Sequence, residues 1–199
     1  MNIDLHVHTL ERSYCARSSE EDHIRAAIAR GLDAIAITDH DRLVPSERLA
    51  DLNARYAPFR VFGGIEVNSG SEHLLVLGVH DSALEDETWT YPDLHAFVEA
   101  RGGFLALAHP FRFHDYIGAD VERFPPHALE LCSHNTPRQA EPRIRALATR
   151  LGVPLLSNSD AHHTSEIGVY YNVLDGEPED EETLVTMLKT GMFTCVVPR

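Results

Sequence analysis

Short apolar runs alternate with longer amphipathic ones along the chain. The short runs end in polar residues and predict strands. They cover residues 2–7, 32–38, 60–67, 73–80, 104–109, 128–132, 153–157, 169–174 and 193–197. The longer runs predict helices near residues 19–30, 45–56, 93–101, 138–150 and 181–189. Ser18 or Ser19 suits the N-cap of the first helix, and Gly31 suits its C-terminal stop.

This alternation predicts an α/β protein with a parallel sheet, either open or closed into a barrel. No repeat, linker or low-complexity segment divides the 199 residues, so we expect one domain over residues 1–199. The acidic stretch at residues 176–182 is typical of a solvated loop that leads into a helix N-terminus.

Polar residues with metal-ligand chemistry recur at or just after the predicted strand ends. They are His6, His8, Asp39, His40, Glu66, His80, His109, Asp160 and His162. In barrels and open parallel sheets, the C-terminal edge of the strands is where functional sites are built. The pattern therefore predicts one site at that edge.

Spacing within these motifs strengthens the prediction. His6 and His8 are two residues apart, so a strand directs both imidazoles to one face, where they can share a metal ion. Asp160 and His162 repeat this spacing. Glu66 follows an apolar strand, and a buried carboxylate there needs a partner; its two oxygens can bridge two divalent ions. Pro110 predicts an extended backbone at His109.

Composition narrows the class of protein further. The formal net charge is −14, with 13 histidines and a single lysine, Lys189. This charge argues against binding to duplex nucleic acid, and no apolar run reaches the roughly 20 residues of a membrane span. Charged and histidine residues begin at Asp4, so we expect no signal peptide. Three separated cysteines indicate a reduced, cytoplasmic protein.

Taken together, HVHT, ITDH, the glutamate of GIEV, AHP and SDAH resemble the ordered motifs of the PHP (polymerase and histidinol phosphatase) family. The resemblance runs from His6 to His162. It implies a distorted TIM-like (β/α)7 barrel, two or three divalent metal ions (Zn, Mn or Fe), and hydrolysis of phosphoesters. The metal site would lie at the C-terminal ends of the strands.

The resemblance also implies a division of the ligands. His6 and His8, with Glu66 and Asp160, would hold the first ion. Glu66 would bridge to a second ion, which His109 and either His73 or His80 would complete. His40 and His162 would hold a third ion, and Cys15 is the soft ligand available in the loop after HVHT.

Other residues carry weaker signals. Arg12 and Arg112 stand beside motifs, where a guanidinium binds phosphate well. His134 follows a predicted strand and is a further candidate for contact with the substrate. His23 and His95 lie on predicted helices, and we expect both to be exposed.

These residues predict a metal-dependent phosphoesterase that acts on a small phosphorylated substrate, either a phosphomonoester or a short nucleotide. Glu66 would bridge the ions that activate a hydroxide. The leaving oxygen would be bound by a third ion or, if that ion is absent, protonated by His162 or His40. One alternative is an amidohydrolase. The variant with a carboxylated lysine is excluded, because the single lysine, Lys189, lies in the last predicted helix. A mononuclear, deaminase-like variant stays open. The other alternative is a non-catalytic metal-binding module. Oligomeric state is not predicted.

Overall fold

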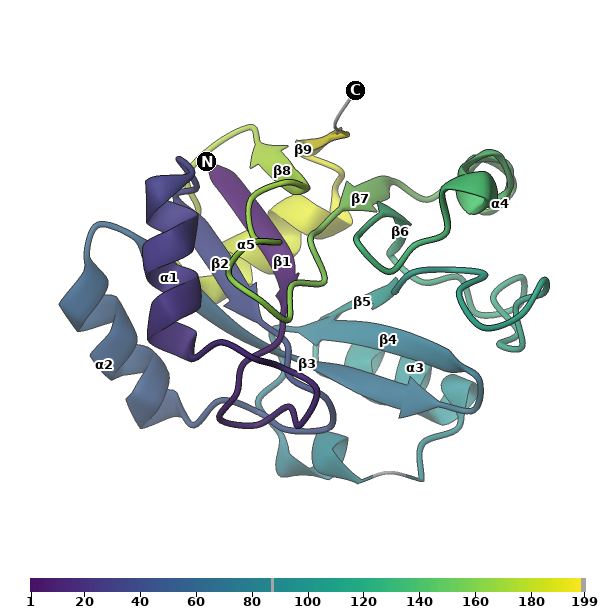
Figure 1. The fold of residues 1–199 in the computed structure, drawn as a ribbon. Helices are drawn as coiled ribbons and strands as arrows, with labels where there is room; N and C mark the ends of the chain where they lie inside the picture. Colours follow the sequence, from purple (N-terminus) through teal and green to yellow (C-terminus); the bar gives the residue numbers. More distant parts are fainter. Residues whose placement is uncertain (87, 198–199) are drawn as a thin grey trace.

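The computed structural model describes residues 1–86 and 88–197. Within them, nine strands form one sheet (Figure 1). Its order is β7-β6-β5-β4-β3-β2-β1-β8-β9. The strands are β1 (Asn2–Val7), β2 (Ala34–Ile37), β3 (Arg60–Ser69), β4 (Glu72–Leu77), β5 (Phe104–Leu107), β6 (Ala128–Cys132), β7 (Leu155–Ser157), β8 (Tyr171–Leu174) and β9 (Phe193–Val196). All nine lie within or close to the predicted runs.

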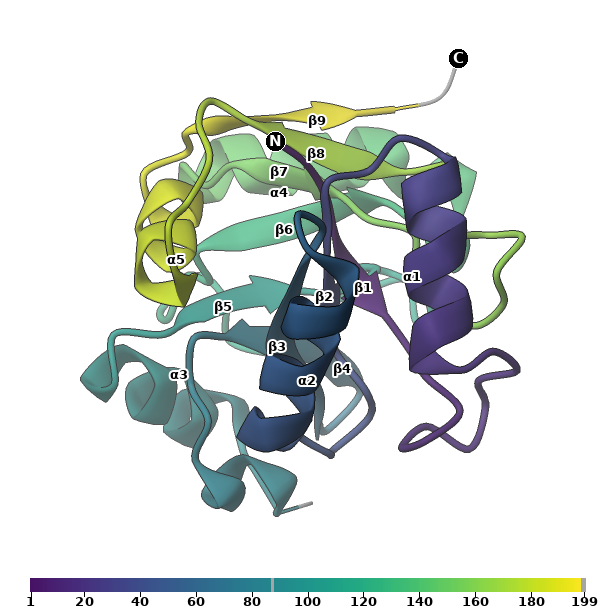
Figure 2. The ribbon, with the colours of Figure 1, turned by 90° about the vertical axis from the view of Figure 1, so that its left-hand side faces the viewer.

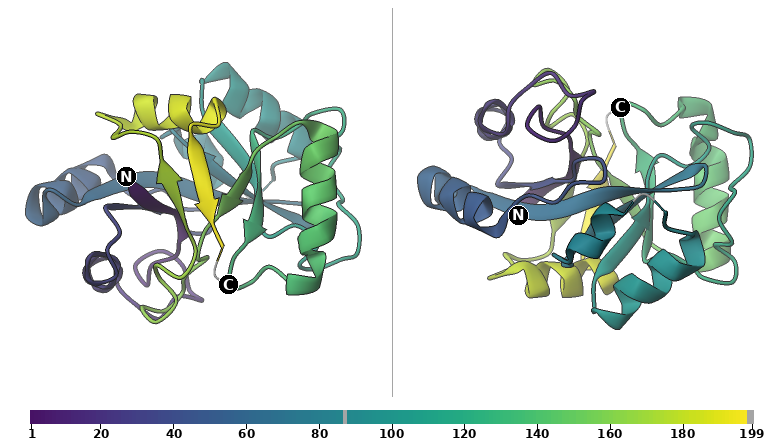
Figure 3. Two further views of the ribbon diagram at one scale, coloured as in Figure 1. Left: turned by 90° about the horizontal axis from the view of Figure 1, so that it is seen from above. Right: turned by 90° about the horizontal axis from the view of Figure 1, so that it is seen from below.

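The two ends of this sheet approach each other, so the sheet is a nearly closed barrel (Figures 1 and 3). Ser157 Oγ on β7 donates a hydrogen bond of 2.5 Å to the carbonyl of Val196 on β9. The buried Asn172 on β8 pairs with Ser157 as a neighbouring strand would. Its Oδ1 accepts from Ser157 N at 3.0 Å, and its Nδ2 donates to Ser157 O at 2.9 Å. The expected α/β, distorted TIM-like barrel is confirmed.

The expectation of a purely parallel sheet is wrong. β4 runs antiparallel to both β3 and β5, and β8 runs antiparallel to both β1 and β9. The tight turn between β3 and β4 explains the first reversal, because Gly70 adopts a φ of 63° that favours glycine. Two residues between the strands are too few for the crossover that parallel neighbours need.

Helices cover the sheet on several sides (Figures 1 and 2). They are the α-helices α1 (Glu20–Ala29), α2 (Ser46–Tyr56), α3 (Tyr91–Ala100), α4 (Glu141–Leu151) and α5 (Glu181–Lys189), and the short 3₁₀ helices η1 (Ser82–Glu85) and η2 (Arg138–Ala140). Ser19 caps α1 as predicted, since its side chain accepts from Asp22 N, and Gly31 follows with a φ of 77°.

Three clusters of buried apolar side chains fix these helices to the strands. Ile24 on α1 and Leu52 on α2 pack with Ile35 and Ile37 of β2. The buried faces of α3 and α4 share a second cluster with strands β3 to β6, and α5 shares a third with both edges of the sheet. Among the described residues, no helix is long and apolar enough to cross a membrane.

The seam at Asn172 predicts a local test of barrel closure. Asn172→Ala leaves the N–H and the carbonyl of Ser157 without partners, so the free energy of unfolding should fall by about 3 kcal/mol. Urea unfolding followed by circular dichroism measures this loss. Gln139→Ala, at an exposed position, is the control and should change stability little. Equal stability of the two variants would show that the seam does not depend on Asn172.

Candidate metal centre

The end of β1 brings two buried imidazoles together, with their ring planes tilted by 60°. The Nε2 atoms of His6 and His8 are 3.0 Å apart. Two nitrogens that bind one zinc ion tetrahedrally, each at about 2.1 Å, lie roughly 3.4 Å from one another. The pair therefore stands close to the separation that a shared divalent ion imposes, as the two-residue spacing predicts.

Glu66 on β3 places its carboxylate at the centre of five imidazoles. Oε1 lies 3.0 Å from His109 Nε2, 3.1 Å from His73 Nδ1 and 3.3 Å from His6 Nε2. Oε2 lies 2.7 Å from His40 Nδ1 and 3.4 Å from His8 Nε2. Each oxygen thus faces its own set of nitrogens, which is the arrangement that a bridging carboxylate needs.

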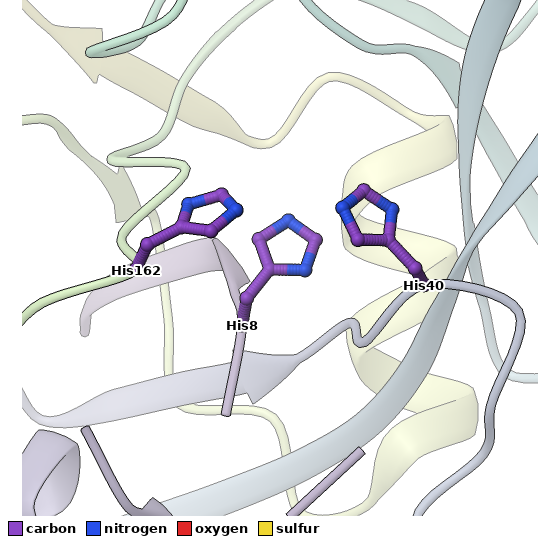
Figure 4. A group of neighbouring side chains, drawn as sticks. All are labelled: His8, His40 and His162. Carbon is purple, nitrogen blue, oxygen red and sulfur yellow. The ribbon is translucent and has the colours of Figure 1, made fainter. Parts of the chain in front are cut away.

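Asp160 and His162 complete the cluster from the loop after β7. Asp160 Oδ1 lies 3.1 Å from His8 Nε2, and its Oδ2 accepts from Asn135 Nδ2 at 2.8 Å. The ring centroids of His162 and His8 are 4.4 Å apart, and His40 lies on the other side of His8 (Figure 4).

Among the residues that the structure describes, four groups of three each offer ligand atoms within 4.8 Å of one another. They are His6 with His8 and Glu66; His6 with His109 and Asp160; His40 with Glu66 and His73; and His8 with His40 and His162. The groups share members, so they form one continuous centre. Asp160 Oδ1 also lies 3.4 Å from His6 Nε2 and 3.1 Å from His8 Nε2, so the four ligands that the resemblance implies for the first ion are close together. In addition, Asp160 groups with His109, and His8 joins His40 and His162.

The donor set fits divalent metal ions. Glu66 Oε2, Asp160 Oδ1 and His40 Nδ1 are buried and have no hydrogen-bond partner. The 2.7 Å approach of His40 Nδ1 to Glu66 Oε2 lacks the angles of a hydrogen bond. Buried polar atoms without partners are costly, and coordination to a cation would satisfy all three. Imidazole and carboxylate ligands suit zinc, manganese and iron.

Electrostatics keep the carboxylates of this centre ionised. Burial raises the pKa of Glu66, but the charge of His6, the hydrogen bond from His109 and the close approach of His40 outweigh it and hold the pKa well below its usual value. The pKa of Asp160 is lowered against burial, mainly by His6 and His8. Burial lowers the pKa of His8 to about 4, so this ring is neutral and able to ligate near neutral pH.

Residues around the centre fix which ring nitrogen faces it. His8 Nδ1 lies 3.3 Å from Ser13 Oγ, which itself donates to Asp39 at 2.6 Å. His162 Nδ1 lies 3.0 Å from the carbonyl oxygen of Asp160. Because these oxygens accept from Nδ1–H, both rings keep the Nε2 lone pair for the centre.

Glu130 on β6 is a site residue that the sequence reasoning missed. Its Oε1 lies 3.0 Å from His6 Nδ1 and accepts from Asn158 Nδ2 at 2.9 Å, while its Oε2 accepts from His109 N at 2.9 Å. The side chain is fully buried. A glutamate within the apolar run at residues 128–132 was the available signal, because a buried carboxylate needs partners.

Of the two histidines offered for the second ion, the structure brings His73 to the centre and leaves His80 away from it. His80 follows β4, which runs antiparallel to β3. The C-terminal end of β4 therefore points away from the strand ends where the centre lies. His80 Nε2 lies 2.5 Å from Glu181 Oε2 on α5, and this contact raises the pKa of His80. Strand-end position does not identify a ligand where the strand is reversed.

Cys15 belongs to none of the four groups found among the described residues. It is half-buried, and burial raises the pKa of its thiol. The structure therefore gives no support to Cys15 as a ligand.

Of the three predicted substrate-binding residues, only one lies at the centre. Arg12 is engaged inside the protein: its Nε donates to Asp39 at 2.8 Å and its Nη2 contacts Thr9 and Glu20. His134 is exposed, and its Nε2 lies 3.1 Å from the carbonyl oxygen of Glu166. Neither reaches the centre, whereas Arg112 does, with Nη1 3.6 Å from Asp160 Oδ2.

Two local expectations are wrong. His23 is fully buried on α1 instead of exposed, because α1 turns this face toward the sheet, and His95 is half-buried. His109 has a φ of 27° and not an extended backbone. Its hydrogen bond from the backbone N–H to Glu130 and the contact of its ring with Glu66 hold it there against the preference of a residue before proline.

The sequence matches the PHP domain over residues 4–140 and the PHP-associated region over residues 139–192. The chain belongs to the PHP family. Strands from both matched regions share one sheet, since β1 pairs with β8. A single domain over residues 1–199 stays a prediction, which this pairing supports.

Curated relatives include the error-prone DNA polymerases of Mycobacterium bovis and Mycobacterium tuberculosis. Each is 27% identical over 204 residues, which cover 80% of this chain but only 18% of the polymerase. The chain thus spans about a fifth of the length of these relatives. The likeness is to one part of a much longer enzyme.

Solved structures share the fold. PsfC from Pseudomonas syringae superposes with a TM-score of 0.72 at 18% identity, over 99% of this chain and 91% of PsfC. A two-domain protein of Bacteroides vulgatus, described as containing a predicted PHP-like metal-dependent phosphoesterase, gives a TM-score of 0.72 at 15% identity. That match covers 99% of this chain and 64% of the other.

Glu130 generates a prediction about metal affinity. The carboxylate of Glu130 accepts in all three of its contacts. In Glu130→Gln, the amide NH₂ must face one of these partners. It then either opposes another donor or forces His6 into the tautomer that lacks a free Nε2 lone pair. We expect the affinity for Mn²⁺ or Zn²⁺ to fall by about ten- to a hundredfold. Metal titration of the purified variants measures this loss.

The matched control for this titration is Glu177→Gln, which removes the same charge from an exposed position. Circular dichroism verifies that both variants fold. Unchanged metal affinity in Glu130→Gln would contradict the role given to this carboxylate.

Proposed function

We propose that the protein is a metal-dependent phosphoesterase that hydrolyses a small phosphorylated substrate, a phosphomonoester or a short nucleotide. One observation carries the proposal: the two oxygens of Glu66 face different sets of imidazole nitrogens, as a carboxylate between two ions requires. When bound, two or three divalent ions (Zn, Mn or Fe) would lower the pKa of a water molecule and polarise the phosphoryl group.

The ligands divide into a buried and an open part. The side chains of His6, His8, Glu66 and Asp160 are almost completely buried. Those of His40, His73 and His162 are 18–21% exposed, and Arg112 is 29% exposed. A substrate phosphate would therefore approach from the side of these four residues.

Residues on this open side suit the remaining parts of the reaction. Arg112 supplies a cation for the phosphate, and its fork geometry suits two phosphate oxygens. His40 and His162 would hold a third ion that binds the leaving oxygen; where that ion is absent, His162 or His40 would protonate this oxygen, because both are partly exposed and adjoin the centre. We assign Glu66 to holding the ions and not to proton transfer, since its pKa is held low.

Other readings have less support. The amidohydrolase variant with a carboxylated lysine needs a lysine in the centre, and Lys189 lies on α5 while Glu66 occupies the bridging position. A mononuclear deaminase would use one ligand group, whereas four overlapping groups are present among the described residues. A non-catalytic metal-binding module would have the same ligands and differs in turnover, which is measurable.

Glu66→Gln tests the proposal. The substitution removes the charge that bridges the groups, so phosphate release should fall by about a thousandfold or more. The assay measures inorganic phosphate from a panel of phosphomonoesters and diesters with Mn²⁺ or Zn²⁺, together with the metal content of the protein. His95→Ala, away from the centre, is the control and should keep nearly full activity.

Two results would count against this function. If wild-type protein binds two or more ions per chain and releases no phosphate from any ester, the non-catalytic module is the better description. If Glu66→Gln and His95→Ala both keep full activity, the centre is misplaced.

A further inference from the structure

The loop after β5 carries two consecutive side chains, those of Arg112 and Phe113, to the open side of the metal centre. His109 and Phe111 have φ values of 27° and 65°, which residues other than glycine rarely adopt. These turns leave His109 directed at Glu66 and place Arg112 and Phe113 next to the cluster. Phe111 is packed against the core and lies under Arg143, whose guanidinium is 4.1 Å from the ring centroid. The strained turn is thus anchored from outside.

Phe113 lies at the edge of the centre and is half-exposed. Its ring centroid is 5.2 Å from that of His73 and 6.0 Å from that of His109. Its exposed fraction is 51%, so part of this large apolar ring is open to solvent. Neighbouring Tyr116 is as exposed, but it stacks on His114 and not on a member of the centre. Proximity to two candidate ligands distinguishes Phe113 from the other exposed aromatic residue of this loop.

Arg112 stands between this ring and the carboxylate of Asp160. Its guanidinium carbon is 5.0 Å from the Phe113 centroid, within the range of a cation–π contact. At 3.6 Å from Asp160 Oδ2, its Nη1 forms an ion pair but no hydrogen bond, so the guanidinium keeps N–H groups that can donate to an anion. One loop therefore offers a phosphate-binding cation and an aromatic face side by side.

We infer that Phe113 determines substrate specificity by stacking on a planar ring in the leaving group while Arg112 binds the phosphate. The inference rests on the function proposed above and narrows its substrate class to phosphoesters with a planar, π-faced leaving group. Two sources share this chemistry: a nucleobase carried on a ribose, and a smaller aromatic ring on a short arm. An aliphatic leaving group of equal size would gain apolar contact but no stacking.

Stacking of a base on an aromatic side chain is worth about 1–3 kcal/mol, which corresponds to roughly a five- to 150-fold change in affinity. We therefore expect planar ligands to bind about tenfold or more tightly than non-planar ligands of the same charge. Phe113→Leu keeps an apolar side chain and removes the π face, so it should abolish this preference with little effect on the non-planar ligand.

The first experiment measures binding without turnover. Benzylphosphonate and cyclohexylmethylphosphonate have the same charge and similar size, cannot be hydrolysed as esters, and differ in the planarity of the ring. Calorimetric titration into the Mn²⁺-loaded protein compares wild type, Phe113→Leu and Phe113→Tyr. Phe113→Tyr should retain the preference. Tyr116→Ala is the control from the same loop and should behave as wild type.

The second experiment measures hydrolysis of esters that all release a primary alcohol. Adenosine 5′-monophosphate and ribose 5-phosphate differ in the base, and benzyl phosphate presents the shorter planar group. A higher kcat/KM for the nucleotide than for ribose 5-phosphate, lost in Phe113→Leu, supports the inference and identifies a nucleobase. The same dependence for benzyl phosphate alone, relative to cyclohexylmethyl phosphate, identifies the shorter ring.

The inference is overturned if neither pair of compounds shows a planar preference, or if the preference survives in Phe113→Leu. Failure of the proposed function gives a different result. In that case no ester releases phosphate, although the phosphonates still bind with a preference that depends on Phe113.

Discussion

The buried carboxylate of Glu66 is the constraint on which the rest of the centre depends. An isolated charge in a protein interior is strongly unfavourable, so the fold must surround it with groups that stabilise it. Here the ends of several strands deliver imidazoles to both of its oxygens. In the proposed function, the same cluster would allow so acidic a chain to bind an anion. Divalent ions held by these ligands would reverse the local charge, while the formal −14 describes the protein without them.

A second layer of buried polar residues holds the ligands in place. Glu130 joins β6 to His6 and to the backbone at His109, and Asp39 joins the end of β2 to the loop after β1 through Thr9, Ser13 and Arg12. These acceptors set the orientation of the rings as well as their position. Their burial within an otherwise apolar sheet shows that part of the interior serves the site and not the packing of the core.

Much of this organisation is readable from the sequence, because strand boundaries and ligand types are local properties. The runs at 2–7, 128–132 and 181–189 coincide with β1, β6 and α5. What the sequence does not show is the direction of each strand in the sheet. Of the two candidates His73 and His80, a parallel β4 would favour His80 at its C-terminal end, whereas the antiparallel β4 brings His73, at its start, to Glu66. Glu130 was not predicted for a related reason: its partners are distant in the sequence, with His6 more than a hundred residues away and His109 about twenty.

The division between buried and open residues separates two demands on the protein. In the proposed function, metal ligation would fix the buried residues His6, His8 and Glu66. Substrate choice would fall to the loop after β5, which is attached at His109 to the centre and at Phe111 to the core. Because both attachments require rare backbone conformations, the backbone that leads to Arg112 and Phe113 is fixed next to the centre. A loop built in this way can change its leaving-group contact at Phe113 without disturbing the ligands below, which is how one metal centre can serve different phosphoesters.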